Sequence, residues 1–387
     1  MMTFELTDEQ QELRSLARKV ARDWYADKAR DWDANRTHFP AEERRKIADL
    51  GLLALTIPEE YGGGGRPLID ALIVQEEFAR VNALSAWPIF EASSGPARVI
   101  DLFGTPEQKQ KFLPPVAAGD KLIAISISEP DAGSAATDVS TRASIEGDEV
   151  VINGAKRWCS GAGYAEQYLV YVRFSSKPGG AGMGGVLVEK DTPGLTFGPQ
   201  EELMGHRGVG SADMFFDDVR VPIENVIIHE GGFNKLFTAF SMERLGNSTM
   251  CLALAQEALD RTAAYVQQRQ QFGKDIVEFQ TVQDTLAKMV VEVEASRMLI
   301  WRAAVKAGAG APDTLEASVA KVYANEMVKR VTDMAIQLHG GYGYSSEYEI
   351  ERMHRDAVGW AIAGGTPAMQ RTRIASEFVG RRFNQRA

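Results

Sequence analysis

The spacing of apolar residues changes twice along this chain, and the two changes divide it into three segments. In residues 1–121, apolar residues recur three to four positions apart, which is typical of amphipathic helices. In residues 122–229, short β-rich runs alternate with turns that contain Gly, Pro and Asn, which predicts strands. In residues 230–387, long helical periods rich in Ala, Leu and Met return, and such helices usually form a bundle. This order predicts an α+β fold with an N-terminal all-α domain, a central antiparallel β domain and a C-terminal helical domain.

Several local signals fit the N-terminal helices. Thr7 with Gln10 matches a capping box, in which side chain and backbone of the first helical turn bond reciprocally. Pro106 follows Thr105, the arrangement of a first-turn proline behind a helix cap. The run from Gly62 to Gly65 is interpreted as a flexible loop, because no strand and helix flank it as a phosphate-binding loop requires.

Composition narrows the functional classes. The chain has 387 residues and a formal net charge of −10, whereas a nucleic-acid-binding protein normally carries a basic stripe. No apolar run is long enough to span a bilayer, and the N-terminus lacks the basic and apolar regions of a secretory signal. The two cysteines and five scattered histidines form no disulfide framework or metal motif. We therefore expect a cytoplasmic protein that has no metal, does not insert into membranes and does not bind nucleic acid.

Two segments of the β region carry residues suited to a planar ligand. Ile125–Ser134 alternates apolar and hydroxyl residues, which places Ser126 and Ser128 on one face of a strand, and then enters a loop that ends at Gly133-Ser134. Such a loop presents N–H groups and hydroxyls to phosphate or carbonyl oxygens. The second segment, Lys156–Ser160, places an indole beside short donors, which suits a planar heterocycle such as a flavin.

These segments and the domain order resemble the acyl-CoA dehydrogenase family from about Leu6 to Gly380. The specific matches are Ile127–Pro130 with Ala132–Ser134, the run Gln337–Tyr344 followed by Arg355-Asp356, and Arg269 with Phe272-Gly273. The resemblance implies an N-terminal helical domain (1–121), a central β-barrel-like domain (122–229) and a C-terminal four-helix bundle (230–387). It also implies FAD as cofactor and a homotetramer, built as a dimer of dimers, in which neighbouring subunits share each FAD site.

The family pattern assigns cofactor residues position by position. Trp158 and Ser160 would contact the isoalloxazine, with the Ser160 hydroxyl near N5, and Ser134 would also help to hold the CoA ester. The remaining residues implied to contact FAD in the same subunit are Ser126, Ser128 and Gly133. Those implied to contact the partner subunit's FAD are Arg269, Phe272, Gln337, Gly341 and Thr366.

The catalytic base departs from the commonest family pattern. Most members carry a glutamate in a C-terminal Glu-Gly-Thr motif, but this chain has Gly364-Gly365-Thr366 there. A minority, including isovaleryl-CoA dehydrogenase and the long-chain enzymes, place the glutamate before an arginine on an earlier helix, as Glu243-Arg244 does here. The resemblance therefore implies that Glu243 is the base, that Arg244 lies near CoA or orients Glu243, and that the Gly364 amide binds the thioester oxygen.

The glycine at position 364 also affects which substrate is expected. A glycine at 364 removes bulk near the α-carbon, which favours a branched, cyclic or substituted acyl group. Glu91 falls where the family lines the far end of the acyl pocket; facing inward it would contact a polar acyl terminus, and the alternative is a surface or paired glutamate. The leading hypothesis is an acyl-CoA dehydrogenase that passes electrons to an electron-transfer flavoprotein.

Parts of the sequence also bear on three other functions. The Ala363–Thr366 segment and Ser134-Ala135 also resemble 3-sulfinopropionyl-CoA desulfinase, a C–S lyase of this family that has glutamine at the position of Glu243. The carboxylate at 243 favours proton abstraction and therefore dehydrogenation. A flavin monooxygenase of this fold would not need Glu243, and DNA-associated relatives carry a basic C-terminal region that an acidic chain ending near Arg382 does not match.

Overall fold

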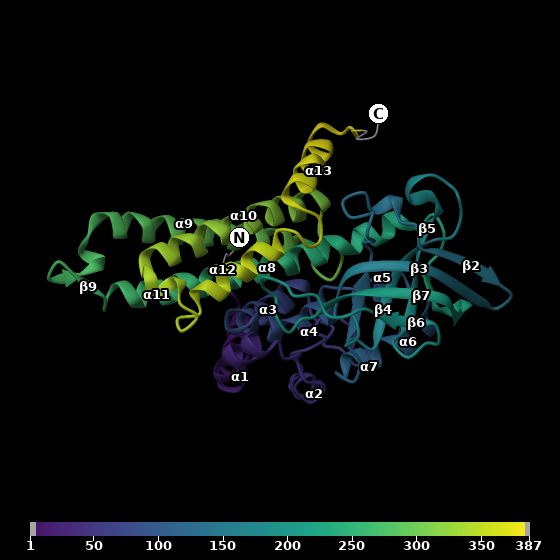
Figure 1. The fold of residues 1–387 in the computed structure, drawn as a ribbon, viewed down its shortest axis with the longest axis horizontal. Helices are drawn as coiled ribbons and strands as arrows, with labels where there is room; N and C mark the ends of the chain where they lie inside the picture. Colours follow the sequence, from purple (N-terminus) through teal and green to yellow (C-terminus); the bar gives the residue numbers. More distant parts are fainter. Residues whose placement is uncertain (1–4, 384–387) are drawn as a thin grey trace.

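The computed structural model describes residues 5–383 and begins with a layer of helices packed beneath the rest of the chain (Figure 1). The capping box at Thr7 is present, since Gln10 N donates to Thr7 Oγ1 at 3.2 Å and Thr7 N donates to Gln10 Oε1 at 3.2 Å. Pro106 is the first residue of its helix, and Thr105 caps it. The helices of this layer are α1 (Asp8–Asn35), α2 (Ala41–Asp49), α3 (Leu68–Val81), α4 (Ala83–Ser93), α5 (Ala97–Phe103), α6 (Pro106–Phe112) and α7 (Pro114–Ala117).

The central region folds into one eight-stranded sheet, at the right of Figure 1. Its strands are β1 (Ile123–Ser126), β2 (Arg142–Glu146), β3 (Glu149–Ser160), β4 (Gln167–Arg173), β5 (Met183–Glu189), β6 (Leu195–Phe197), β7 (Ser211–Pro222) and β8 (Val226–Ile228). The strand order is β6-β7-β3-β2-β4-β5-β8, with β1 beside β4. Most pairings are antiparallel, as expected, but β1 and β2 each pair with β4 in parallel. The expected strand through Ser128 ends at Ser126, so Ser128 lies in the following loop.

The C-terminal region is a bundle of long helices, at the left and centre of Figure 1. Its helices are α8 (Phe233–Val266), α9 (Gln280–Ala307), α10 (Thr314–His339), α11 (Gly341–Tyr344), α12 (Ile350–Trp360) and α13 (Pro367–Val379). A short hairpin of β9 (Gln270–Gln271) and β10 (Lys274–Asp275) joins α8 to α9. Between residues 5 and 383, no helix combines the length and apolar character needed to cross a membrane.

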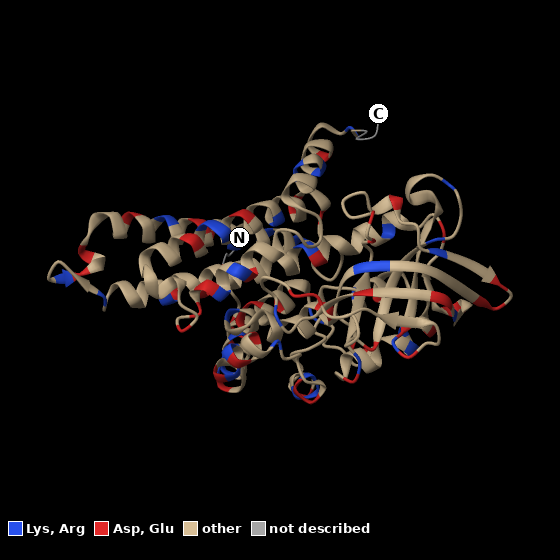
Figure 2. Cartoon of the chain, in the orientation of Figure 1, with Lys and Arg blue, Asp and Glu red and all other residues tan. Residues whose placement is uncertain are grey.

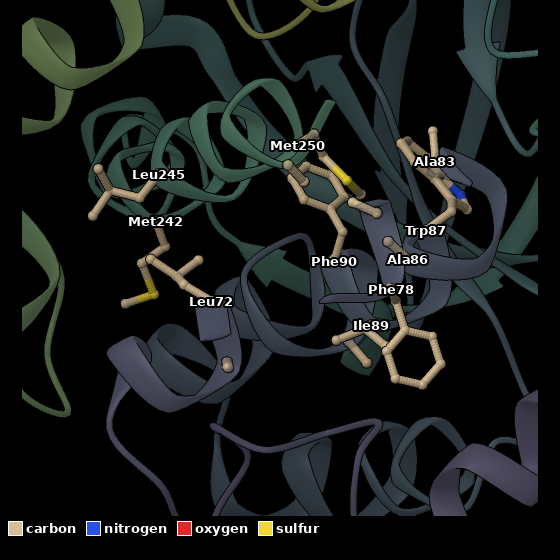
Figure 3. Packing of buried hydrophobic residues seen from close by; sticks show 14 of the residues in the cluster. Leu72, Phe78, Ala83, Ala86, Trp87, Ile89, Phe90, Met242, Leu245 and Met250 are labelled. Atoms are coloured by element: carbon tan, nitrogen blue, oxygen red, sulfur yellow. The ribbon is translucent and has the colours of Figure 1, made fainter. Parts of the chain in front are cut away.

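Helix α8 is the element that joins the three regions. It packs against α10 and α9 in the bundle, α3 in the N-terminal layer and β5 of the sheet. Figure 3 shows Met242 and Leu245 of α8 on the side of Leu72 from α3, and Phe90 of α4 beside Met250. Because α8 is buried along most of its length, several of its polar residues, such as Arg244 and Asn247, are enclosed by other elements. Lys, Arg, Asp and Glu are interspersed along the other helices and are not gathered into one basic stripe (Figure 2).

Candidate active site

Glu243 and Gly364 lie together although 121 positions separate them in the sequence. Helix α12 ends at Trp360, and residues 361–365 connect it to Thr366, which caps α13. In this connection Gly364 has a φ of +66°, a backbone conformation that glycine adopts without steric cost. A Cβ atom placed on Gly364 would lie 3.5 Å from Glu243 Oε1. The carboxylate of Glu243 therefore borders the space into which a side chain at 364 would point.

The pKa of the Glu243 carboxyl lies near neutral pH. Burial raises its pKa to about 7, and the positive charges of Arg244 and Lys321 oppose that shift. The side chain is only partly buried, so a ligand can reach it. A carboxylate with a pKa near 7 is a stronger base than an exposed glutamate and is still mostly ionised above pH 7. Both properties are required to remove a weakly acidic proton.

Arg244 is a buried cation without a counter-charge in direct contact. Its side chain is 2% exposed, and its Nε and Nη1 atoms have no hydrogen-bond partner among the described residues. Burial and the nearby charge of Arg373 lower the pKa of Arg244 to about 10, while Glu243 opposes this shift. The hydroxyl of Tyr171 on β4 is also buried without a partner. Unpaired buried donors of this kind are costly unless a ligand supplies acceptors.

Glu91 lies in the interior and not at the surface. Its side chain on α4 is 2% exposed, and Oε2 has no hydrogen-bond partner among residues 5–383. Burial raises the pKa of Glu91 well above its ordinary value, and the negative charge of Glu243 raises it further. Glu91 is therefore an interior carboxyl on the Glu243 side of α4 whose charged form is disfavoured, which excludes the surface position that the sequence left open.

The two hydroxyl-bearing segments of the β region are tied together. Arg157 N donates to Ser128 O at 2.8 Å, and the buried Lys156 donates to Ile127 O at 3.0 Å and to Glu129 Oε1 at 2.9 Å. Glu129 and Ala132 exchange backbone hydrogen bonds of 3.0 and 3.1 Å, which closes the tight turn expected before Gly133. Ser126 is buried with an unpartnered Oγ, whereas Gly133 and Ser134 are exposed, and a Cβ on Gly133 would meet no atom within 4 Å. The loop therefore leaves room for a ligand against its backbone.

Trp158 faces outward because β3 is irregular at this point. The register between β3 and β7 shifts between Lys156 and Cys159, and Trp158 has a φ of +60°. Its indole is 52% exposed, and the Arg157 guanidinium lies 4.4 Å from the ring centroid. Ser160 follows in regular pairing with Ser211. An exposed indole next to a hydroxyl on a rigid strand fits a planar cofactor, whereas a core tryptophan would be covered.

A second group of expected cofactor residues lies at the opposite end of the bundle (Figure 1). Arg269 follows α8, and its guanidinium lies 5.5 Å from the ring centroid of Tyr342. Phe272 is 92% exposed at the tip of the β9–β10 hairpin, and Gln337 and Gly341 are exposed where α10 passes into α11. The structure thus separates these residues from Trp158, while Thr366 lies two positions after Gly364.

Sequence reasoning missed two polar residues beside Glu243. Lys321 of α10 is completely buried, and Asn247 lies one turn after Glu243 on α8. Lys321 occupies an apolar helix face that also carries Ala317 and Ala324, both buried. A lysine at an apolar position of a helical period was the signal that could have identified it.

Comparison with known proteins covers nearly the whole chain. Family models match residues 7–120 (acyl-CoA dehydrogenase, N-terminal domain), 124–219 (middle domain) and 230–378 (C-terminal domain). The chain is 38% identical to a probable acyl-CoA dehydrogenase of Bacillus subtilis (strain 168), over 98% of this chain and 100% of that protein. It is 37% identical to a 3-sulfinopropanoyl-CoA desulfinase of Paraburkholderia xenovorans (strain LB400), over 99% of both chains.

A solved structure agrees with the sequence relatives. Butyryl-CoA dehydrogenase from Megasphaera elsdenii superposes with a TM-score of 0.94 at 34% identity, over 98% of this chain and 100% of that chain. These matches make the protein a flavoprotein oxidoreductase with FAD as its cofactor, acting on the CH–CH group of an acyl-CoA. The chain belongs to the acyl-CoA dehydrogenase family.

Proposed function

We propose that this protein dehydrogenates an acyl-CoA thioester between its α- and β-carbons and that Glu243 removes the α-proton. The observation that carries the proposal is the position of the Glu243 carboxylate beside Gly364, with a pKa raised by burial to about 7. Glycine at 364 has no side chain that could serve as base. Among the described residues around Gly364, Glu243 supplies the carboxylate.

Glu243, Gly364 and Arg244 have different roles in the proposed reaction. Glu243 accepts the α-proton on a carboxylate oxygen, and the positive charges of Arg244 and Lys321 favour its ionised form before transfer. The Gly364 N–H makes no hydrogen bond to the described residues, so it is free to donate to the thioester oxygen and stabilise the charge that develops there. The unpartnered Nε and Nη1 of Arg244 offer further donors to the CoA ester.

The open loop and the exposed indole fit FAD. Ser126, Ser128, Trp158 and Ser160 would hold the isoalloxazine, and Gly133 with Ser134 would leave space for the adjoining ligand atoms. When bound, FAD supplies the acceptor for the hydride that leaves the β-carbon.

The oligomer is part of the proposal. The residues at the far end of the bundle would contact the FAD of a partner subunit in a homotetramer. They are the half-buried Arg269 and the exposed Phe272, Gln337 and Gly341, joined by Thr366. Light scattering after size-exclusion chromatography tests the assembly, and Arg269→Ala should lower FAD occupancy while the Trp158 site stays intact. We propose electron-transfer flavoprotein as the electron acceptor.

The substrate proposed is a branched, cyclic or substituted acyl group. Gly364 adds no bulk beside the base, and Glu91 places a carboxyl in the interior whose protonated form, favoured by burial, would donate to a polar acyl terminus. A panel of linear, branched, cyclic and hydroxylated acyl-CoAs separates these possibilities. A clear preference for short linear acyl-CoAs would contradict this part of the proposal.

The central experiment is anaerobic bleaching of the flavin by that panel in the wild type, Glu243→Gln and Glu243→Asp. We expect Glu243→Gln to slow bleaching by the best substrate about 10²–10⁴-fold, the usual contribution of a general base, and Glu243→Asp to retain part of the rate. Unchanged bleaching by the Gln variant would exclude Glu243 as the base. If acyl-CoAs fail to bleach the flavin and a 3-sulfinoacyl-CoA releases sulfite, the protein is a C–S lyase like its desulfinase relatives.

A further inference from the structure

Lys321 of α10 is completely buried and has only neutral groups as hydrogen-bond partners. Its ammonium donates to Ala363 O at 2.8 Å, to Asn325 Oδ1 at 2.9 Å and to Asn247 Oδ1 at 3.0 Å. These acceptors satisfy the three N–H bonds of the ammonium but leave its charge uncompensated. A buried charge normally requires an opposite charge nearby, because desolvation of a single ion is very costly.

The carboxylate that faces this ammonium is Glu243. A Cβ placed on Gly364 would lie 3.9 Å from Lys321 Nζ and 3.5 Å from Glu243 Oε1, so both charged groups border the same small region. They form no direct ion pair among the described residues, which leaves the carboxylate oxygens free for a substrate. Burial lowers the pKa of Lys321 to about 8, and the charge of Glu243 counteracts this shift.

The same ammonium holds the chain that carries Gly364. Ala363 immediately precedes Gly364, and its carbonyl accepts the 2.8 Å hydrogen bond from Lys321. Asn247 Nδ2 donates to Trp360 O at 3.1 Å, at the end of α12. Together these bonds attach both ends of the short connection between Trp360 and Gly364 to α8 and α10.

The other charged and titratable groups facing Glu243 come from three elements. Arg244 lies next to it on α8, Glu91 approaches from α4, and Tyr171 from β4. Of these, only Arg244 is a second cation, and it lies beside Tyr171 and Arg373 with unpartnered donors. Lys321 differs because its N–H donors are used within the protein, so its ammonium group keeps the same position whether or not substrate is bound.

We propose that Lys321 is a positioning residue for proton transfer: it holds the Ala363–Gly364 segment beside the base and supplies a positive charge that favours the ionised form of the Glu243 carboxylate. The inference rests on the proposed role of Glu243 as base. Lys321 itself neither receives the proton nor touches the substrate, and its effect is exerted through Glu243 and through the Gly364 amide.

The test is infrared spectroscopy of the protonated carboxyl band as a function of pH, in the FAD-loaded protein. The Glu243 band is the one that disappears in Glu243→Gln, so each variant is compared with its own Glu243→Gln partner. We expect Lys321→Met to raise the pH at which the band disappears by about one to two units, as expected for a unit charge ~6 Å away at an effective dielectric constant of ~20. The rate of flavin bleaching should show the same displacement along the pH axis.

Asn325→Ala is the matched control. Asn325 belongs to the same buried network, donating to Asn247 Oδ1 at 2.9 Å and to Cys251 Sγ at 3.1 Å, but it carries no charge. Its loss should destabilise the fold and leave the titration of Glu243 within about 0.3 pH unit of the wild type. Lys321→Gln, which keeps a donor for Ala363 O without the charge, should shift the titration like Lys321→Met and provides the measurement if the Met variant does not fold.

The outcomes separate this inference from the proposed function. A folded Lys321→Met or Lys321→Gln protein in which Glu243 titrates as in the wild type overturns the role of Lys321. Equal shifts in Asn325→Ala also overturn it, because a general loosening of the network would then explain the effect. Unchanged bleaching in Glu243→Gln refutes the role of Glu243 as base. The infrared measurement of the coupling between Lys321 and Glu243 remains valid in that case, because it does not depend on activity.

Discussion

Replacing Glu243 by glutamine should stabilise the fold at alkaline pH, because the native structure holds this carboxyl in surroundings that disfavour its charge. The pKa of Glu243 is about 7 in the folded protein against an ordinary value of 4.5. A folded-state pKa above the unfolded one means that the folded state binds the proton more tightly. The contribution of this group to stability is therefore complete below pH 4.5 and is lost as the pH rises through 7.

The expected size of this change in stability follows from the two pKa values of Glu243. Integrating proton binding between pH 5 and pH 8 gives a loss of about 2.5 kcal/mol in the wild type, which the uncharged glutamine does not suffer. With an unfolding entropy of ~2 cal/mol/K per residue, cooperative unfolding of a chain of this length converts that energy into about 3 °C in Tm. Glu243→Gln should therefore gain about 3 °C relative to the wild type on going from pH 5 to pH 8.

Differential scanning calorimetry of wild type and variant, at matched FAD content and both pH values, measures this difference. Glu12→Gln, which removes an exposed glutamate of α1, controls for the loss of a carboxylate as such and should show no comparable pH dependence. Equal Tm differences at pH 5 and pH 8, or a loss of stability on going to pH 8, would refute the assignment of a burial-raised pKa to Glu243.

Three further predictions concern positions around the site and in the core. Gly364→Ala places a Cβ at a φ of +66° and 3.5 Å from Glu243 Oε1, so it should cost about 1 kcal/mol in urea unfolding and lower kcat/KM. Lys156→Met leaves Glu129 buried and unpaired, which should cost about 3–5 kcal/mol in urea unfolding, and adding Glu129→Gln should recover part of it. Burial would raise the pKa of Glu257, but Arg22 and Arg261 overcome it and lower the pKa to about 2. Its stabilisation is therefore present above pH 4.5 and lost as the pH falls through 2, so the deficit of Glu257→Gln in unfolding free energy should shrink towards pH 2.

Much of the fold could be predicted because the signals are local. The capping residues Thr7 and Thr105 start their helices where their neighbours in sequence indicate. In α1, Ala17 and Val20 are buried, but Leu16, which lies next to Ala17 in the apolar period of this helix, is 42% exposed. A period shows which stripe of a helix is apolar, and the packing of neighbouring elements then decides where that stripe ends.

For the candidate site, too, one part could be predicted from the sequence and another part could not. Family motifs pointed to Glu243 and to the glycine at 364, and the structure brings them together. The family pattern left the position of Glu91 open between the interior and the surface. The apolar period around Lys321 indicates that this lysine is buried, but it does not indicate which groups surround it. Each is enclosed by helices and strands from distant parts of the chain, and that enclosure determines whether its charge is paired.

The sequence by itself determined the order of helical, β and helical regions and the residue types available for chemistry, because hydrophobic period and motif spacing are properties of the chain alone. Only the tertiary structure decided how acidic those groups are and what they face. A pKa depends on desolvation and on charges that the fold brings close. In this protein the crossing of α8 and α10 beside the connection from α12 to α13 places the Glu243 carboxylate, a glycine amide and a buried ammonium around one point.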